Sequence, residues 1–439
     1  MSARYSIPKP QGVSRQLFNY ALPSVLGMLI VGLQTIIDGL FVSRGVGAEG
    51  LAAVNISMPL INVMLAVSIM IISGGVVITG VAQGRGEDRL VRGYTTLTFV
   101  VLVATILVLS ILVFLLLDPL CSFLGADAAV KPHVRRYLGI IGSGFIFYCI
   151  PNFTEAFTRL RGRPNMVFLS GTICCVVNVV LDYFFVLRMG WGVSGAAVAT
   201  CAANTTATIV LAPMVRMGRL TGSWREVGKV FYNGSSELLT SISAAVTTFI
   251  FNLVLMHQVG YTGVAALTIV CYLNFIVNMS VFGLSQALYP LMSFQLGTRS
   301  YAGIRSLLKW SLLFSACIGW GVYLLVLCFR NGIVEAFSGG DEALVALATT
   351  AATWVPLHYL LSFANIIGSS FHTAVERPIE SAVIALCRSI VFVLVPLLVL
   401  VPVVGELGVW LSMPIAELLT LAVTLPLVRR TLMRLRSTM

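Results

Sequence analysis

Two aspartates inside long apolar stretches are the first candidates for chemistry in this sequence. Asp38 and Asp182 each lie about five residues before the end of such a stretch, which is roughly 8 Å of α-helix. A carboxylate in the middle of a membrane costs about 3 kcal/mol on insertion scales and is a functional candidate by default. Two acids at equal depth on different helices can converge, so we expect Asp38 and Asp182 to form one site.

Neutral oxygen donors accompany both acids. Gln34 lies four residues before Asp38 and Asn178 four residues before Asp182, so each shares a helix face with its acid. Thr200, on the next apolar stretch, lies at a similar depth. Two carboxylates and three neutral side chains suit a weakly held Na⁺ or a shared proton. The alternative is that each acid only hydrogen-bonds to a neighbouring helix.

A second polar group precedes the seventh apolar stretch. Asn233, Ser235, Ser236 and Glu237 lie where that stretch begins. One interpretation is a first-turn acid that faces the positive end of the helix dipole. The other is a polar entrance at which Glu237, Asn233 and Ser236 bind a cationic substrate.

Three further features leave alternatives open. Pro23 could let the first helix bend or could be a static kink, because proline removes a backbone hydrogen bond. Glu155 lies four residues before Arg159, which predicts an ion pair at the surface. Glu417 follows Pro414 in the last apolar stretch and has no obvious partner.

The composition excludes most classes of protein. Hydrophobic residues make up 58% of the 439 residues and charged residues only 10%, with a mean hydropathy of +0.96, whereas soluble proteins carry roughly 25% charged residues. The chain is therefore expected to be a polytopic membrane protein and not a soluble enzyme or a nucleic-acid module. HExxH and GxSxG motifs are absent, which argues against an intramembrane enzyme. No cofactor is expected beyond a coupling ion.

Apolar runs predict twelve membrane-spanning helices, because backbone polar groups in lipid must be satisfied within the segment. The predicted spans are 17–43, 51–80, 93–117, 134–157, 166–187, 193–215, 235–258, 262–294, 306–329, 344–373, 380–401 and 408–428. The first 16 residues carry basic residues and two prolines but no short apolar core, so a cleavable signal peptide is not expected.

The basic residues predict the orientation of these spans. Most of the 28 Lys and Arg residues fall in the N-terminal segment, in the loops that follow even-numbered spans and in the C-terminal segment. The opposite loops hold only Arg44, Lys131, Arg135, Arg136, Arg188 and Arg330, and Arg388 lies within a span. Because cytoplasmic loops carry the excess of Lys and Arg, both termini are expected in the cytoplasm of a cell with this protein in its plasma membrane.

The second half of the chain repeats the first. Residues 46–56 (VGAEGLAAVNI) match 259–269 (VGYTGVAALTI) at an offset of 213, Pro164 matches Pro378 at 214, and 192–193 match 408–409 at 216. Six spans per half give parallel repeats with a shared central cavity, an architecture suited to alternating access. The predicted lobes are 1–216 and 229–439, joined by a cytoplasmic loop over 217–228.

Several motifs resemble the multidrug and toxic compound extrusion (MATE) transporters. They are residues 19–24 (NYALPS), 38–44 (DGLFVSR), 50–54 (GLAAV), 178–182 (NVVLD), 195–200 (GAAVAT) and 282–291 (FGLSQALYPL). The resemblance covers essentially the whole chain. It implies an all-α integral membrane fold with twelve helices in two six-helix lobes around a central cavity.

The resemblance also implies a function and a site. It implies efflux of drug-like, often cationic compounds by antiport with Na⁺ or H⁺, and no enzymatic activity. In the DinF-like branch, which this chain most resembles, the ion site maps onto Asp38, Asn178, Asp182 and Thr200. The segment 359–373 has no carboxylate, so a C-lobe ion site of another branch is not expected. Partners are a small organic substrate and the lipid bilayer, with no nucleic acid, and the protein is expected to be a monomer. A flippase for a lipid-linked precursor is the alternative.

Overall fold

The computed structural model describes residues 12–126, 130–338 and 342–438. Arg4 and Lys9 of the predicted basic N-terminal segment lie outside these residues. The described chain is almost entirely helical and divides into two compact units. The first unit comprises residues 19–234, and the second comprises 12–18 and 235–439.

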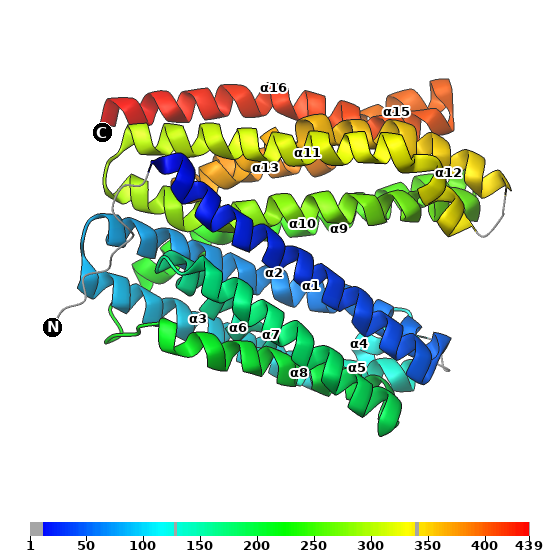
Figure 1. Ribbon diagram of the computed structural model, residues 1–439, viewed down its shortest axis with the longest axis horizontal. Coiled ribbons are helices and arrows are strands. Elements are labelled where there is room, and N and C mark those ends of the chain that lie inside the picture. The colour runs from blue at the N-terminus through cyan, green and yellow to red at the C-terminus, as the bar shows by residue number, and fades with distance from the viewer. Residues whose placement is uncertain (1–11, 127–129, 339–341, 439) are drawn as a thin grey trace. The chain divides into compact units, whose positions relative to one another are not determined.

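The first unit is a bundle of helices, most of which pack against neighbours within the unit (Figure 1). They are α1 (Val13–Val46), α2 (Ala48–Gly84), α3 (Asp88–Leu115), α4 (Leu117–Phe123), α5 (Lys131–Ser143), α6 (Ile146–Leu160), α7 (Pro164–Asp182), η1 (Tyr183–Arg188), α8 (Gly192–Leu211) and η2 (Ala212–Met214).

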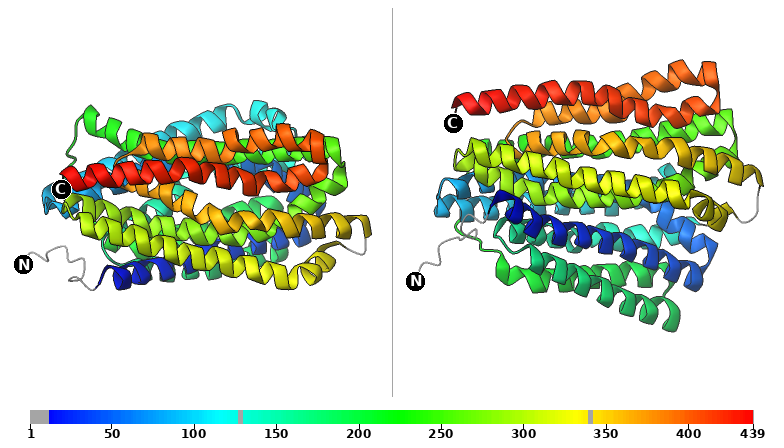
Figure 2. Two further views of the ribbon diagram at one scale, coloured as in Figure 1. Left: turned by 90° about the horizontal axis from the view of Figure 1, so that it is seen from above. Right: turned by 45° about the horizontal axis from the view of Figure 1, so that its top comes forward.

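The second unit repeats this plan, and its last two long helices, α15 and α16, pack side by side in both views of Figure 2. Its helices are α9 (Trp224–Gln258), whose residues up to 234 belong to the first unit, α10 (Tyr261–Gly297), α11 (Tyr301–Ser338), α12 (Glu342–Trp354), η3 (Val355–His358), α13 (Tyr359–Ala374), α14 (Pro378–Leu386), η4 (Cys387–Val391), α15 (Phe392–Val404) and α16 (Glu406–Thr438).

Within the described residues, eleven helices are long and apolar enough to cross a membrane. A bent pair, α5 with α6, raises the number to as many as twelve. Large side chains such as Phe114, Phe123 and Leu398 are exposed, as expected for residues that face lipid and not water. The prediction of an all-α membrane fold with twelve spans is confirmed.

Two predicted boundaries differ from the structure. The segment 134–157 is not one straight helix, because α5 and α6 meet at an angle of 45°. The break falls beside Gly144, whose lack of a side chain disfavours a continuous helix. Helix α9 begins at Trp224, inside the segment predicted as a loop over 217–228.

The repeat seen in the sequence is also present in the backbone of the two units. Gly47 precedes α2 with φ 85° and ψ −160°, and Gly260 precedes α10 with φ 80° and ψ −161°. Arg163 precedes α7 with φ −120° and ψ 55°, and Arg377 precedes α14 with φ −122° and ψ 59°. Glycine is needed at the first pair because L side chains rarely adopt a positive φ. The two halves therefore repeat local conformation as well as sequence.

Candidate ion site in the first unit

Asp182 lies where helix α7 changes its winding. It is the last residue of α7 and is followed directly by η1, a π-helical turn in which the Met189 N–H donates to the Phe184 carbonyl at 2.9 Å. A π turn inserts an extra residue into a helix and is found frequently at functional sites. The widened turn starts immediately after the acid.

Two glycines let neighbouring helices approach this π turn closely. A Cβ atom on Gly45 of α1 would overlap a methyl carbon of Val186. A Cβ atom on Gly195 of α8 would lie 2.9 Å from the carbonyl carbon of Phe185. Only glycine permits such contacts, and small residues serve the same purpose generally where membrane helices pack. Helices α1 and α8 thus both approach η1 closely, at the end of α7.

The structure brings Asp38 and Asp182 together. Their carboxyl groups lie within hydrogen-bonding reach of each other. Asp182 and Asn178 are fully buried, whereas Asp38 is half-buried. The convergence of the two acids from α1 and α7 agrees with the equal depth expected from the sequence.

Apart from the contact between the two carboxyl groups, several polar atoms of this group have no hydrogen-bond partner within the described chain. They are one carboxylate oxygen of Asp38, both carboxylate oxygens of Asp182, and both amide atoms of Asn178. Buried polar atoms are nearly always hydrogen-bonded in proteins. Five unpartnered atoms on three side chains therefore indicate a position that another group can occupy, such as a proton, a cation or water.

Thr200 and Gln34 lie on α8 and α1, and neither makes a hydrogen bond to the acid pair within the described chain. Thr200 is half-buried on α8, and its hydroxyl donates to the Ala196 carbonyl of its own helix at 3.0 Å. The hydroxyl oxygen keeps lone pairs that can accept a hydrogen bond or bind a cation. Gln34 is half-buried on α1, one turn before Asp38. Pro23 lies inside α1 and not near its start, because the helix begins at Val13.

The phenols of two tyrosines complete the surroundings of the acid pair. Tyr137 of α5 lies within electrostatic range of both Asp38 and Asp182, and Tyr148 of α6 lies within range of Asp38. Sequence reasoning did not single out either residue, since tyrosines in apolar segments have no charge to draw attention. A phenol can donate a hydrogen bond to a carboxylate, so both are candidate proton donors near the pair.

The group has the chemistry of a small-cation or proton site. Carboxylate, amide and hydroxyl oxygens are the ligands that hard cations prefer. Two carboxyl groups in mutual hydrogen-bonding reach can also share one proton. The donor set fits either occupant equally well.

The residues predicted as a substrate entrance lie early in α9. Glu237 accepts a hydrogen bond from the Tyr289 hydroxyl at 2.6 Å, and the Ser236 hydroxyl is 2.9 Å from that of Thr373. Asn233 is buried. Because α9 begins at Trp224, Glu237 is not a first-turn acid, and the interpretation as a helix cap was wrong.

Two other acids lie in surroundings that differ from the predictions. Glu155 and Arg159 form the expected ion pair at 3.0 Å, but their side chains are only 16% and 5% exposed, so it is not a surface pair. Glu417, which had no obvious partner in the sequence, accepts a hydrogen bond from Arg388 at 2.6 Å. The two residues lie on different helices, and no short spacing links them.

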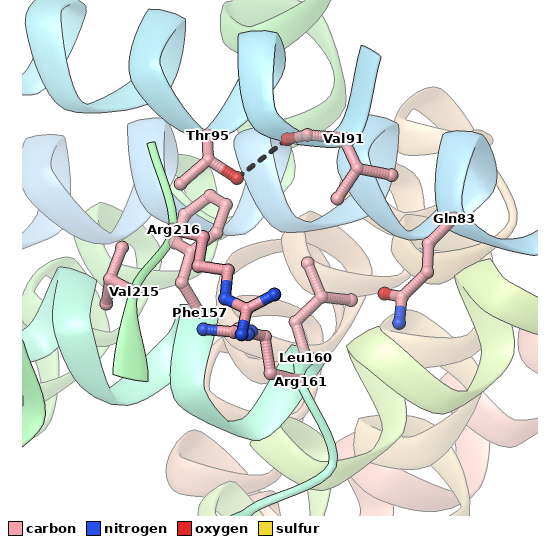
Figure 3. A pocket seen from close by; sticks show the side chains of 8 residues that line it. All are labelled: Gln83, Val91, Thr95, Phe157, Leu160, Arg161, Val215 and Arg216. Carbon is pink, nitrogen blue, oxygen red and sulfur yellow. Dashed lines mark hydrogen bonds between the residues drawn. The ribbon is translucent and has the colours of Figure 1, made fainter. Parts of the chain in front are cut away.

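One cavity lies among α2, α3, α6 and the segment after η2 (Figure 3). Its lining includes Gln83, Thr95, Arg161 and Arg216, and the Thr95 hydroxyl donates to the Val91 carbonyl at 2.8 Å. Its volume is about 10 Å³, roughly the space of one water molecule. It is too small for a drug-like molecule.

Membrane spans arranged in two repeated units, with a buried acid pair in one of them, define a polytopic membrane protein of the transporter class. The MatE family model matches residues 23–184 and 238–398. The chain therefore belongs to the MatE family, whose members are membrane transporters and not enzymes.

Relatives and solved structures agree with this assignment. The chain is 23% identical to the FAD transporter of Shewanella oneidensis, over 93% of this chain and 92% of that protein. It is also 23% identical to the multidrug export protein MepA of Staphylococcus haemolyticus, over 92% of this chain and 91% of that protein. The bent form of the Vibrio cholerae MATE transporter VcmN has a TM-score of 0.91 at 18% identity, over 96% and 98% of the two chains.

Proposed function

We propose that this protein is a secondary active exporter that exchanges a small organic compound for Na⁺ or H⁺ by alternating access. The observation that carries the proposal is the acid pair of Asp38 and Asp182, whose buried oxygens have no partner within the described chain. A site that must bind and release an ion in every cycle has to leave ligand atoms free when it is empty.

The proposed coupling site consists of Asp38, Asn178, Asp182 and Thr200, with Gln34 beside it on α1. Asp182 and Asn178 are held in place by the packing of η1 between Gly45 and Gly195. Asp38 comes from α1, so occupation of the site would alter how α1 contacts α7. A bend of α1 at Pro23 would convert this change into movement of the helix.

The proposed substrates are organic cations, taken up at a cytoplasmic entrance that includes Glu237. Relatives named as multidrug export proteins support a drug-like substrate. The relative named as an FAD transporter makes an anionic compound the necessary comparison. We further propose that the protein acts as a monomer in the plasma membrane with both termini in the cytoplasm.

Transport by purified protein in proteoliposomes tests this proposal. Accumulation of ethidium is measured under an imposed Na⁺ gradient at constant pH, and then under an imposed pH gradient without Na⁺. Export coupled to one of the two gradients is expected, with no accumulation when both are dissipated. FAD is tested under the same gradients. Accumulation that needs no ion gradient would contradict the proposal, and coupled transport of FAD without ethidium would reverse the proposed charge of the substrate.

A further inference from the structure

The second unit holds a buried polar network that the proposed coupling site does not use. Glu417 of α16 accepts hydrogen bonds from Arg388 Nε at 2.6 Å and from Asn365 Nδ2 at 2.7 Å. The Thr424 hydroxyl donates to Asn365 Oδ1 at 2.7 Å. The Glu417 side chain is 6% exposed and that of Arg388 is 23% exposed. Glu417 is thus a buried carboxylate with a permanent positive charge against it.

The repeat places this network on the helices that correspond to α7 and α8 of the first unit. It does not coincide with the counterparts of the ion-site residues, because the offset of 214 carries Asn178 and Asp182 onto Phe392 and Pro396. The offset of 216 carries Thr200 of α8 onto Ala416 of α16, directly before Glu417. The offset of 214 carries Cys174, one turn before Asn178 on α7, onto Arg388. Arg388 also lies in a π turn, η4, whose Phe392 N–H donates to the Cys387 carbonyl. Corresponding helices therefore carry a polar group in each unit.

The polar residues of the two units differ in whether their carboxylate oxygens have hydrogen-bond donors within the described chain. In the first unit, oxygens of Asp38 and Asp182 have no partner in the described chain. In the second unit, the Glu417 carboxylate has a partner on each oxygen. The difference arises because Arg388 supplies a cation from within the protein. A guanidinium cannot be deprotonated in a protein, so this charge is constant.

His358 is the other titratable group near Glu417. It lies within electrostatic range of both Glu417 and Arg388, and its Nδ1 is 2.7 Å from the Val355 carbonyl. If the ring is neutral, this contact indicates that the proton is on Nδ1 and is donated to the Val355 carbonyl. His358 therefore leaves the Arg388–Glu417 pair as the charged centre of the network.

We propose that Arg388 is a built-in cation that permanently occupies a small-cation site of the second unit. Glu417, Asn365 and Thr424 form a small-cation site that the guanidinium fills, so the C-lobe binds no exchangeable ion. This inference rests on the proposed coupling role of the first unit, and it sets the number of coupling-ion sites at one. Removal of the guanidinium opens a second site.

Thermal stability in Na⁺ and in choline tests the proposal, because a ligand that binds only the folded state raises the melting temperature with its concentration. Arg388→Met is expected to gain a stabilisation by Na⁺ at pH 8, or by acidification in choline, that is larger than the one the native protein shows through the site of its first unit. Arg388→Met with Glu417→Gln is expected to lose this gain. Arg388→Lys keeps the charge and is expected to gain nothing. A folded Arg388→Met protein whose response to Na⁺ and to acid is no larger than that of the native protein overturns the proposal.

Loss of one partner of a buried ion pair is strongly destabilising, so a measurement without the Arg388→Met variant is also needed. Equilibrium binding of ²²Na⁺, or proton release on Na⁺ addition, is compared between the native protein, Asp38→Asn and Glu417→Gln. All exchangeable binding is expected to disappear in Asp38→Asn and to remain in Glu417→Gln. Binding that survives Asp38→Asn but disappears in Glu417→Gln overturns the built-in cation.

The two proposals fail in different ways. Full binding in Asp38→Asn contradicts the coupling site of the first unit, whatever Arg388 does. The comparison of Arg388→Met with the double variant Arg388→Met and Glu417→Gln depends on Glu417 alone. It therefore still tests the built-in cation if the coupling site of the first unit is wrong.

Discussion

The carboxyl groups of Asp38 on α1 and Asp182 at the end of α7 lie within hydrogen-bonding reach of each other. Helix α7 gives way to the π turn η1 at this point, and Gly45 and Gly195 let α1 and α8 pack against that turn. The geometry of the pair is therefore set by the packing of three helices. Four predictions follow from it and from the entrance residues.

The amide of Asn178 is predicted to contribute to ion affinity without being indispensable. Asn178→Ala removes one neutral ligand from a buried position and leaves both acids in place. A hydrogen bond or neutral ligand of this kind is worth about 1 kcal/mol, so a loss of about fivefold in apparent affinity for the coupling ion is expected. The apparent affinity is measured from transport rate against ion concentration. An unchanged affinity would remove Asn178 from the site.

The close contact between α8 and η1 is predicted to be essential for the position of Asp182. Gly195→Ala would bring a Cβ to 2.9 Å from backbone atoms of Phe185, and overpacking of this kind costs about 1–3 kcal/mol. Reduced thermal stability and reduced coupled transport are expected.

Gly171→Ala in α7 is the matched control for this substitution. A Cβ there would meet no atom within 4 Å, and alanine favours helix over glycine. Gly171→Ala is expected to retain stability and transport. Equal behaviour of the two variants would show that the approach of α8 to η1 does not position Asp182.

Glu237 is predicted to favour cationic substrates through its charge. Glu237→Gln should raise the apparent KM for cationic drugs about fivefold, equivalent to about 1 kcal/mol, with little change for neutral compounds. Tyr289→Phe, which removes the 2.6 Å hydrogen bond but keeps the charge, is the control and should leave the ratio of the two KM values unchanged. If both classes of compound shift equally in Glu237→Gln, the acid only holds Tyr289 in place.

Much of the fold could be predicted because a membrane constrains sequence strongly. Each span must be apolar and helical, so spans are visible as apolar runs. The repeat was visible because it keeps the glycines and prolines that fix special backbone angles, as at Gly47 and Gly260. The approach of Asp38 to Asp182 was predictable from depth alone, since both acids lie the same distance from a helix end.

The remaining features depend on tertiary contacts that no local pattern reveals. The pairing of Arg388 with Glu417 joins separate helices, so the partner of either side chain cannot be predicted from the local sequence. The π turns at η1 and η4 have the same apolar composition as ordinary helix. The bend between α5 and α6 is a single break beside Gly144, within a run that reads as one span.

The central claim is that the acid pair couples ion entry to export. Neutralising either acid should abolish coupling, whereas loss of a buried charge favours insertion of the helix and should leave the fold intact. Asp118 of α4 is the control, because its side chain is 62% exposed and does not belong to the pair of Asp38 and Asp182.

The most direct measurement is accumulation of substrate against its own gradient in proteoliposomes, driven by the ion gradient that drives the native protein. Asp38→Asn and Asp182→Asn, each verified as folded and monodisperse, are predicted to show no accumulation, while Asp118→Asn matches the native protein. Native accumulation in either Asp38→Asn or Asp182→Asn would contradict the account.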